Sequence, residues 1–215
     1  MAGGTWENQN KVRPGVYIRF TSADTLGLTV GERGIVTICE PLPWGPVGQV
    51  MTITPDMDTT SLTGYPIHDP HNLFLQQIFA GSKRTAAPKG VLLYRPDISG
   101  AAQAAVTVES LTATAVYPGA RGNDIRIVVD ALTEPESTFQ VSTVVDGDIV
   151  DQQQVATCEE LVSNEWVRFS GTGAPAETAG AALTGGENGT VDSGDYADYL
   201  TAIEPYKFDI MIYDG

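Results

Sequence analysis

The sequence YPGARGNDI, residues 117–125, separates two segments in which apolar and polar residues alternate. Every second residue is apolar from Leu111 to Tyr117, and the same alternation resumes from Ile125 to Asp130. A period of two predicts two half-buried strands. Between them, Pro118-Gly119 and Gly122-Asn123 supply the fixed φ angle and the positive-φ positions that a tight connection needs. The stretch therefore predicts a β-hairpin or a β-arch, and it carries no pattern of a catalytic site.

Upstream of this stretch, the pattern is that of an α/β protein. Residues 34–39 and 91–94 are nearly continuous apolar segments, which predict strands buried on both faces. Between them, a helix is predicted with Asp69 as N-cap, Pro70 at its first position and Gly81 at its end. Its expected apolar face consists of Leu73, Phe74, Ile78 and Phe79. Strand, helix and strand together indicate a βαβ-like core.

From about residue 99 the pattern changes to short strands. Asp146-Gly147 between two alternating segments predicts a type I′ hairpin turn. Thr157 with Glu160 three residues later predicts a capping box on a short helix. Residues 171–190 contain six glycines and are interpreted as a linker or loop.

The α/β pattern returns after the glycine-rich stretch. Ser193 is the predicted N-cap of a helix that stops at Pro205, and residues 208–213 predict a third buried strand. Because a strand of the central type closes the sequence, we expect a C-terminal domain to be missing. The predicted fold is therefore mixed α/β. An α/β core (21–98 plus 186–215) is interrupted by an inserted β-rich domain (99–185), and an extended N-terminal arm and strand precede it (1–20).

The N-terminal arm begins with a polar segment, residues 1–15, that has no periodicity. A short segment of strong β propensity follows it, namely Val16, Tyr17, Ile18, Arg19 and Phe20. Such a strand can be an edge strand of its own domain, or it can add to the sheet of a neighbouring molecule. The residues alone favour the first alternative.

The charge is distributed unevenly along the chain, whose net charge is −15. Residues 1–95 carry eight Lys and Arg against seven Asp and Glu, whereas residues 96–215 carry four against twenty. An acidic surface of this kind argues against nucleic-acid binding and is typical of a solvated outer face. The sequence shows neither a secretory signal nor an apolar run long enough to cross a membrane. Cys39 and Cys158 are expected to be free cysteines.

No candidate chemical site has the spacing that its chemistry requires. His68-Asp69-Pro70-His71 could offer metal ligands, but Asp69 and Pro70 fit a helix cap better. Asp146-Gly147-Asp148 lacks the rest of a calcium loop. Residues 185–189 are rich in glycine but lack the Lys-Ser/Thr of a P-loop. We therefore predict no catalytic residue, no cofactor and no metal, so that the chain is not an enzyme.

Several segments, in order, resemble the tail sheath proteins of contractile bacteriophages and phage-tail-like particles. They include PGVYI at 14–18, WGPVG at 44–48 and LTGGENG at 183–189. The stretch at 117–125 is similar to the family's YPG-x-x-GN-x-I motif, which assigns a structural turn to Tyr117, Pro118, Gly119, Gly122 and Asn123. The likeness covers nearly the whole chain.

The resemblance implies a structural subunit of a contractile sheath. Such a subunit polymerises around a tail tube and contracts to drive the tube through a cell envelope. The implied partners are other copies of the chain in stacked rings or a helix, the tail tube protein, and baseplate and tail terminator proteins, without nucleic acid or membrane. The location would be a virion or a phage-tail-like particle made in the host bacterial cytoplasm. The resemblance also favours intermolecular strand addition for residues 16–20. A β-rich extracellular binding or adhesin module is the alternative.

Overall fold

The computed structural model describes residues 34–81, 86–134 and 137–213, so the predicted arm and its strand at 16–20 lie outside the described residues. The α/β part contains a four-stranded sheet with the order β13-β1-β3-β2. Strand β1 (Ile35–Cys39) pairs in parallel with β3 (Gly90–Arg95) and with β13 (Ile210–Ile212). Strand β2 (Gln49–Ile53) is antiparallel to β3, so the sheet is mixed.

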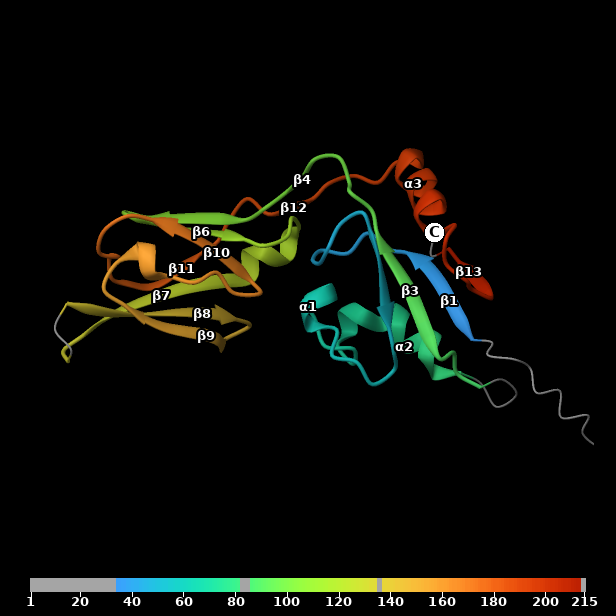
Figure 1. The fold of residues 1–215 in the computed structure, drawn as a ribbon, viewed down its shortest axis with the longest axis horizontal. Helices are drawn as coiled ribbons and strands as arrows, with labels where there is room; N and C mark the ends of the chain where they lie inside the picture. Colours follow the sequence, from blue (N-terminus) through green and yellow to red (C-terminus); the bar gives the residue numbers. More distant parts are fainter. Residues whose placement is uncertain (1–33, 82–85, 135–136, 214–215) are drawn as a thin grey trace, which may run out of the picture. The chain divides into compact units, whose positions relative to one another are not determined.

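Helices cover both faces of this sheet (Figure 1). On one face lie the short helices α1 (Thr60–Thr63) and η1 (Pro70–Asn72), followed directly by α2 (Leu73–Ala80). On the other face lies α3 (Ser193–Ile203). Each face has its own apolar cluster, one with Leu75 of α2 and the other with Tyr199 and Ile203 of α3.

The apolar face of α2 differs from the prediction. Leu73 is 53% exposed, and the fully buried residue is Leu75, with Phe74, Ile78 and Phe79 packed beside it. The predicted first turn is a separate 3₁₀ segment, η1, with Asp69 as its N-cap. Because a 3₁₀ turn holds three residues instead of 3.6, it rotates the face that the following helix presents.

The part of the sequence between β3 and α3 forms a β-sandwich of two packed sheets. One sheet has the order β10-β6-β5 and the other the order β11-β7-β8-β9. The bounds are β5 Ala105–Val108, β6 Leu111–Ala115, β7 Ile125–Leu132, β8 Thr138–Val145, β9 Asp148–Val155, β10 Val167–Gly171 and β11 Thr178–Ala182. The predicted alternation is correct, since Leu111, Ala113 and Ala115 of β6 and Ile125, Ile127 and Val129 of β7 fill one core.

Strands β6 and β7 belong to different sheets, so their connection is a β-arch and not a hairpin. The 3₁₀ helix η2 (Ala120–Asp124) forms the arch. By contrast, β8 and β9 form the expected hairpin, with φ of 55° at Asp146 and 94° at Gly147.

The β-sandwich is inserted into the α/β part through two adjacent chain segments. They are β4 (Ala101–Ala102) and β12 (Glu187–Asn188), which pair antiparallel. This arrangement confirms the predicted fold class, an α/β core interrupted by a β-rich insertion. The interpretation of 171–190 as a linker was wrong, because β11 and β12 lie there. Strand β11 could not be predicted because its sequence, TAGAA, consists of small residues without an alternation of apolar and polar side chains.

Three further local predictions were wrong. The N-cap of α3 is Asp192, not Ser193, and it forms a capping box with Asp195. The side chain of Thr157 makes no capping hydrogen bond to η3 (Cys158–Glu160). Strand β13 is an edge strand and not a buried one, with Ile210 58% and Met211 41% exposed, since β1 is its single neighbour among the described strands.

Candidate functional site at the junction of sheet and sandwich

The histidine-containing segment is a helix cap. The Asp69 carboxylate accepts hydrogen bonds from the backbone N–H of His71 at 2.9 Å and from its Nδ1 at 2.7 Å. These bonds lower the pKa of Asp69. In the described part of the chain, no three His, Cys, Asp or Glu side chains are grouped so that they could hold a metal ion. None of the helices described has the length and apolar character needed to span a bilayer.

The two cysteines are free, as predicted, and the structure shows that both are buried. Burial raises the pKa of the Cys39 thiol to about 12, so that this thiol stays protonated near neutral pH. A buried, protonated thiol is a poor nucleophile. The buried charged side chains lie instead where the α/β part meets the sandwich.

Trp44, in the loop after β1, completes the core of the sandwich. Its side chain is 1% exposed and belongs to the sandwich cluster. Its ring centroid lies 4.9 Å from that of Trp166 and 5.4 Å from that of Tyr117, the latter edge to face. A loop of the α/β part is therefore built into the core of the inserted part.

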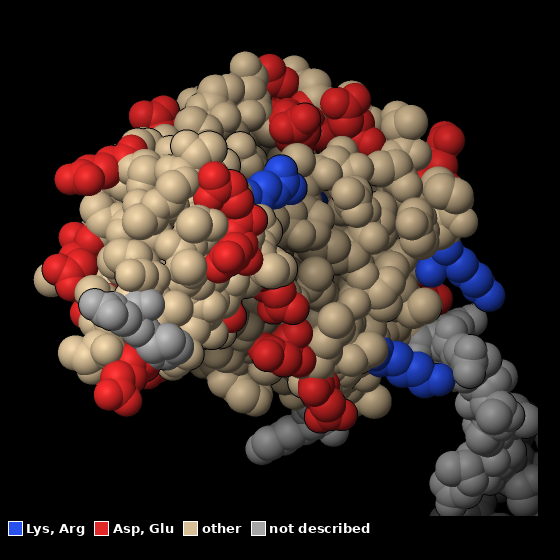
Figure 2. Space-filling model, turned by 60° about the vertical axis from the view of Figure 1, so that its left-hand side comes forward, with Lys and Arg blue, Asp and Glu red and all other residues tan. Residues whose placement is uncertain are grey.

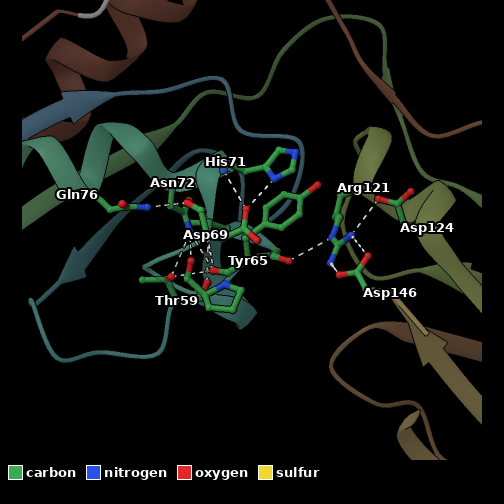
Figure 3. Close-up of polar contacts among 12 residues, drawn as sticks. Thr59, Tyr65, Asp69, His71, Asn72, Gln76, Arg121, Asp124 and Asp146 are labelled. Atoms are coloured by element: carbon green, nitrogen blue, oxygen red, sulfur yellow. Dashed lines mark hydrogen bonds and ion pairs between the residues drawn. The ribbon is translucent and has the colours of Figure 1, made fainter. Parts of the chain in front are cut away.

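Arg121, in η2, connects the two parts through its guanidinium group (Figure 3). Nε donates to the carbonyl oxygen of Gly64 at 3.1 Å, and the group lies 4.1 Å from the ring centroid of Tyr65. On the sandwich side, Nη1 donates to Asp124 at 3.0 Å, and both terminal nitrogens donate to Asp146. Burial opposes the charge of Arg121, but the two carboxylates outweigh this effect, and the pKa of Arg121 is raised.

Tyr65 is held in place by the α/β part. Its ring stacks on that of His71 with centroids 4.1 Å apart. The buried Asn72 side chain donates to the backbone carbonyls of Tyr65 and Pro66, each at 2.9 Å, and so fixes the loop (Figure 3). Arg121 therefore meets a preorganised surface.

Arg95, at the end of β3, makes a second connection. Nη1 donates to the carbonyl of Gly45, and Nη2 donates to the carbonyl of Pro118 in the arch at 2.7 Å. Because Arg95 is 1% exposed and these two acceptors are uncharged, burial lowers its pKa to about 10, and the side chain stays charged at neutral pH.

Glycine allows close backbone approach at two points of the junction. Gly119 has φ 129°, and a Cβ there would lie 2.1 Å from the carbonyl oxygen of Pro43. Gly45 has φ 107°, and a Cβ there would lie 1.8 Å from the carbonyl oxygen of Leu62. Neither position can accept another residue without backbone movement.

The five residues of the predicted turn motif lie in or beside the arch, and one of its two glycines differs from the expectation. Gly119 has the positive φ, whereas Gly122 does not. Gly122 is instead required by packing, since a Cβ there would lie 2.9 Å from that of Ala104. Asn123 exchanges two hydrogen bonds of 2.9 Å with the backbone of Gly186 and so ties the arch to the returning chain. Tyr117 packs on Trp44, and Pro118 accepts from Arg95.

Sequence reasoning missed Arg121, Arg95 and Asn72 as junction residues. The signal for Arg121 was its place inside the motif, where it is one of four Lys and Arg in residues 96–215. Most other charges there are acidic, and Figure 2 shows acidic side chains spread over the face in view. A rare cation in an acidic region is a candidate for a buried ion pair.

Models of two sheath protein regions match this chain. Residues 99–188 match the phage tail sheath protein beta-sandwich domain, and residues 33–95 match the tail sheath protein Gp18 domain III N-terminal region. The chain belongs to the phage tail sheath protein family. Its membership in a family of structural proteins confirms the prediction that it is not an enzyme.

Individual sheath proteins show the same relationship. The crystal structure of a sheath tail protein from Desulfitobacterium hafniense has 42% identity and a TM-score of 0.78, and the match covers 92% of this chain and 45% of that one. For a sheath tail protein from Listeria innocua the identity is 29%, the TM-score 0.72, and the coverage 84% and 40%.

Curated relatives come from Bacillus subtilis strain 168. XkdK, a protein of the phage-like element PBSX, is 34% identical over 98% of this chain and 48% of its own length. The uncharacterised protein YqbK is 32% identical with the same coverage. The sheath chain thus spans about half the length of the curated relatives it matches.

Proposed function

We propose that this chain is a structural subunit of a contractile tail sheath, which polymerises around a tail tube and contracts to drive the tube through a cell envelope. The observation that carries the proposal is the match of two consecutive segments, 33–95 and 99–188, to two regions of tail sheath proteins. The proposed location is the sheath of a phage or a phage-tail-like particle assembled in the host bacterial cytoplasm.

The proposed partners are further copies of the chain, the tail tube protein, and baseplate and tail terminator proteins, without nucleic acid or membrane. A sheet edge with no second neighbour among the described strands supports assembly between copies. Strand β13 exposes Ile210 and Met211 and has one neighbour among the described strands. Unpaired backbone groups at such an edge can accept a strand from another molecule. We propose residues 16–20 of a neighbouring copy as an intersubunit strand.

We propose that the chain is divided as the sequence predicts. Residues 1–20 provide the arm and strand, residues 21–98 with 186–215 the α/β core, and residues 99–185 the inserted β-rich domain. The sandwich is then an outer, acidic part, and the core carries the contacts between copies.

Electron microscopy of the complete gene product tests the sheath proposal. We expect hollow tubes or stacked rings, because a heterologous contact repeated without closure builds a helix. Deleting residues 1–20 should leave the fold unchanged by circular dichroism and abolish the tubes. A matched control that deletes only residues 2–10 keeps the strand at 16–20 and should still assemble. Tubes formed equally well by both deletions would contradict the role of the strand.

Immunogold labelling separates the sheath from the adhesin alternative. An antibody raised against residues 99–188 should label particles evenly along their tails, because every subunit of a sheath is equivalent. Label confined to the tail tip or to the cell surface would overturn the sheath proposal in favour of a binding module.

A further inference from the structure

The guanidinium group of Arg121 is bound from both sides of the junction. The α/β part contributes the carbonyl oxygen of Gly64 and the ring of Tyr65, and the sandwich contributes the carboxylates of Asp124 and Asp146 (Figure 3). These groups come from separate segments of the chain: the α1–η1 loop, η2 itself and the β8–β9 turn. The planar guanidinium fixes direction as well as distance, because its donors have a rigid geometry.

Burial is distributed unevenly over this group of side chains. Arg121 has 4% of its side chain exposed, whereas Asp124 has 50% and Asp146 59%. Removing Arg121 would leave two carboxylates that water can solvate. Removing the carboxylates would leave a buried cation without an anionic partner, which is the costly arrangement.

The other connections at the junction have a different character. Trp44 fills the sandwich core, so its loss leaves a cavity inside that core. The backbones of Pro43 and Gly119 lie so close together that position 119 has no room for a side chain. A substitution there would therefore disturb the local folding of the arch. Arg121 and Arg95 make the side-chain contacts across the junction that can be removed while both apolar cores stay intact, and of these two Arg121 is the one with carboxylate partners on the sandwich side.

We infer that Arg121 is a positioning residue that sets the orientation of the β-sandwich relative to the α/β sheet, separately from the folding of either part. Without it, the two parts remain connected through the short β4–β12 pair, the Trp44 loop and the hydrogen bonds of Arg95 to Gly45 and Pro118, which restrict their separation more than their rotation. The inference concerns the isolated chain and does not depend on the proposed sheath function.

The test measures a distance across the junction. Spin labels are attached to cysteines that replace Val162 of the sandwich, 69% exposed, and Leu200 of α3, 51% exposed. The native cysteines are buried, so we expect them to stay unlabelled under native conditions. Pulsed electron paramagnetic resonance on the folded chain should give a narrow distance distribution. With Arg121→Met the distribution should become at least about twofold broader, while near-ultraviolet circular dichroism of the aromatic core stays unchanged.

Two matched variants separate orientation from stability. Asp146→Asn should lower the melting temperature more than Arg121→Met does, because it weakens the compensation of a buried charge, yet it should keep the narrow distribution, since Gly64, Tyr65 and Asp124 still hold the guanidinium. Arg168→Met removes an exposed arginine of β10 and should change neither quantity.

Two results would overturn the inference. One is a distribution for Arg121→Met that is as narrow as that of the wild type. The other is loss of the near-ultraviolet signal in Arg121→Met, which would show that Arg121 serves folding of the sandwich and not its orientation. Because the readout needs no assembly, a negative result leaves the sheath proposal untouched.

Discussion

At the scale of single residues, the junction depends on two kinds of residue. Glycines allow close packing of the backbone, and charged residues connect the loops of the two parts. Gly122 illustrates the first kind. It lies inside η2, and its missing side chain leaves room for Ala104 and Ala115. Arg121, the preceding residue, illustrates the second kind, with a buried charge whose partners face the solvent.

Replacing Gly122 with Val should destabilise the chain by about 2–3 kcal/mol, because overpacking a close contact forces the neighbouring backbone apart. Denaturant unfolding measures this change. Gly122→Ala should cost less, and combining it with Ala104→Gly should restore part of the loss, since a Cβ at 122 would lie 2.9 Å from the one at 104. Absence of any rescue by Ala104→Gly would place the clash elsewhere.

The stability should fall in acid because of Asp146. The hydrogen bond from Arg121 lowers the pKa of this carboxyl below its ordinary value of 3.8. A carboxyl with a depressed folded-state pKa contributes stability that is present above its unfolded pKa and lost as pH falls through the folded pKa. The melting temperature should therefore be level from pH 7 to about pH 5 and decline below about pH 4.

Asp146→Asn is the control for this pH dependence. It should lower the melting temperature at pH 7 and make the decline in acid shallower, since the group that titrates is gone. Curves that run parallel from pH 7 to the acid limit would assign the acid sensitivity to other carboxyls, such as Asp69, whose pKa is also lowered.

At the scale of elements, caps and turns decide where helices begin. Helix α3 begins after Asp192, whose carboxylate accepts from the N–H groups of Gly194 and Asp195. Asp195 accepts in return from the N–H of Asp192 at 2.8 Å. Asp192→Ala should cost about 1 kcal/mol of stability, whereas Ser193→Ala should be nearly neutral. Thermal unfolding of the two variants compares them, and equal losses would contradict the cap.

Elements with strong periodicity could be predicted from sequence, and elements specified by tertiary contacts could not. The alternation on both sides of residues 117–125 correctly predicted β6 and β7, but whether they form a hairpin or an arch depends on Trp44 and the other core residues between the sheets. Strand β11 consists of small residues and is defined by its pairing with β7. At the junction, the motif pointed to the correct segment, but apart from Asp124, three residues on, the hydrogen-bond partners of Arg121 lie 57 and 25 residues away in sequence.

At the scale of the whole molecule, the sandwich is not a self-contained unit. A fragment of residues 99–188 lacks Trp44, which is fully buried among Tyr117 and Trp166. We expect this fragment to lack the near-ultraviolet signal of a packed aromatic core. In the full chain, Trp44→Ala should cost about 3–5 kcal/mol and Trp44→Phe distinctly less. A natively packed fragment would show that the loop is dispensable.

The order of the sheet, β13-β1-β3-β2, also has a consequence for synthesis on the ribosome. Strands β1, β2 and β3 emerge early and can pair at once, whereas β13 emerges only after the whole sandwich, 175 residues separating Gly34 from its partner Asp209. One edge of β1 therefore lacks its partner strand β13 while the inserted sandwich is being translated. During that interval this edge of β1 lacks β13, so strands of neighbouring nascent chains can compete with β13 for it.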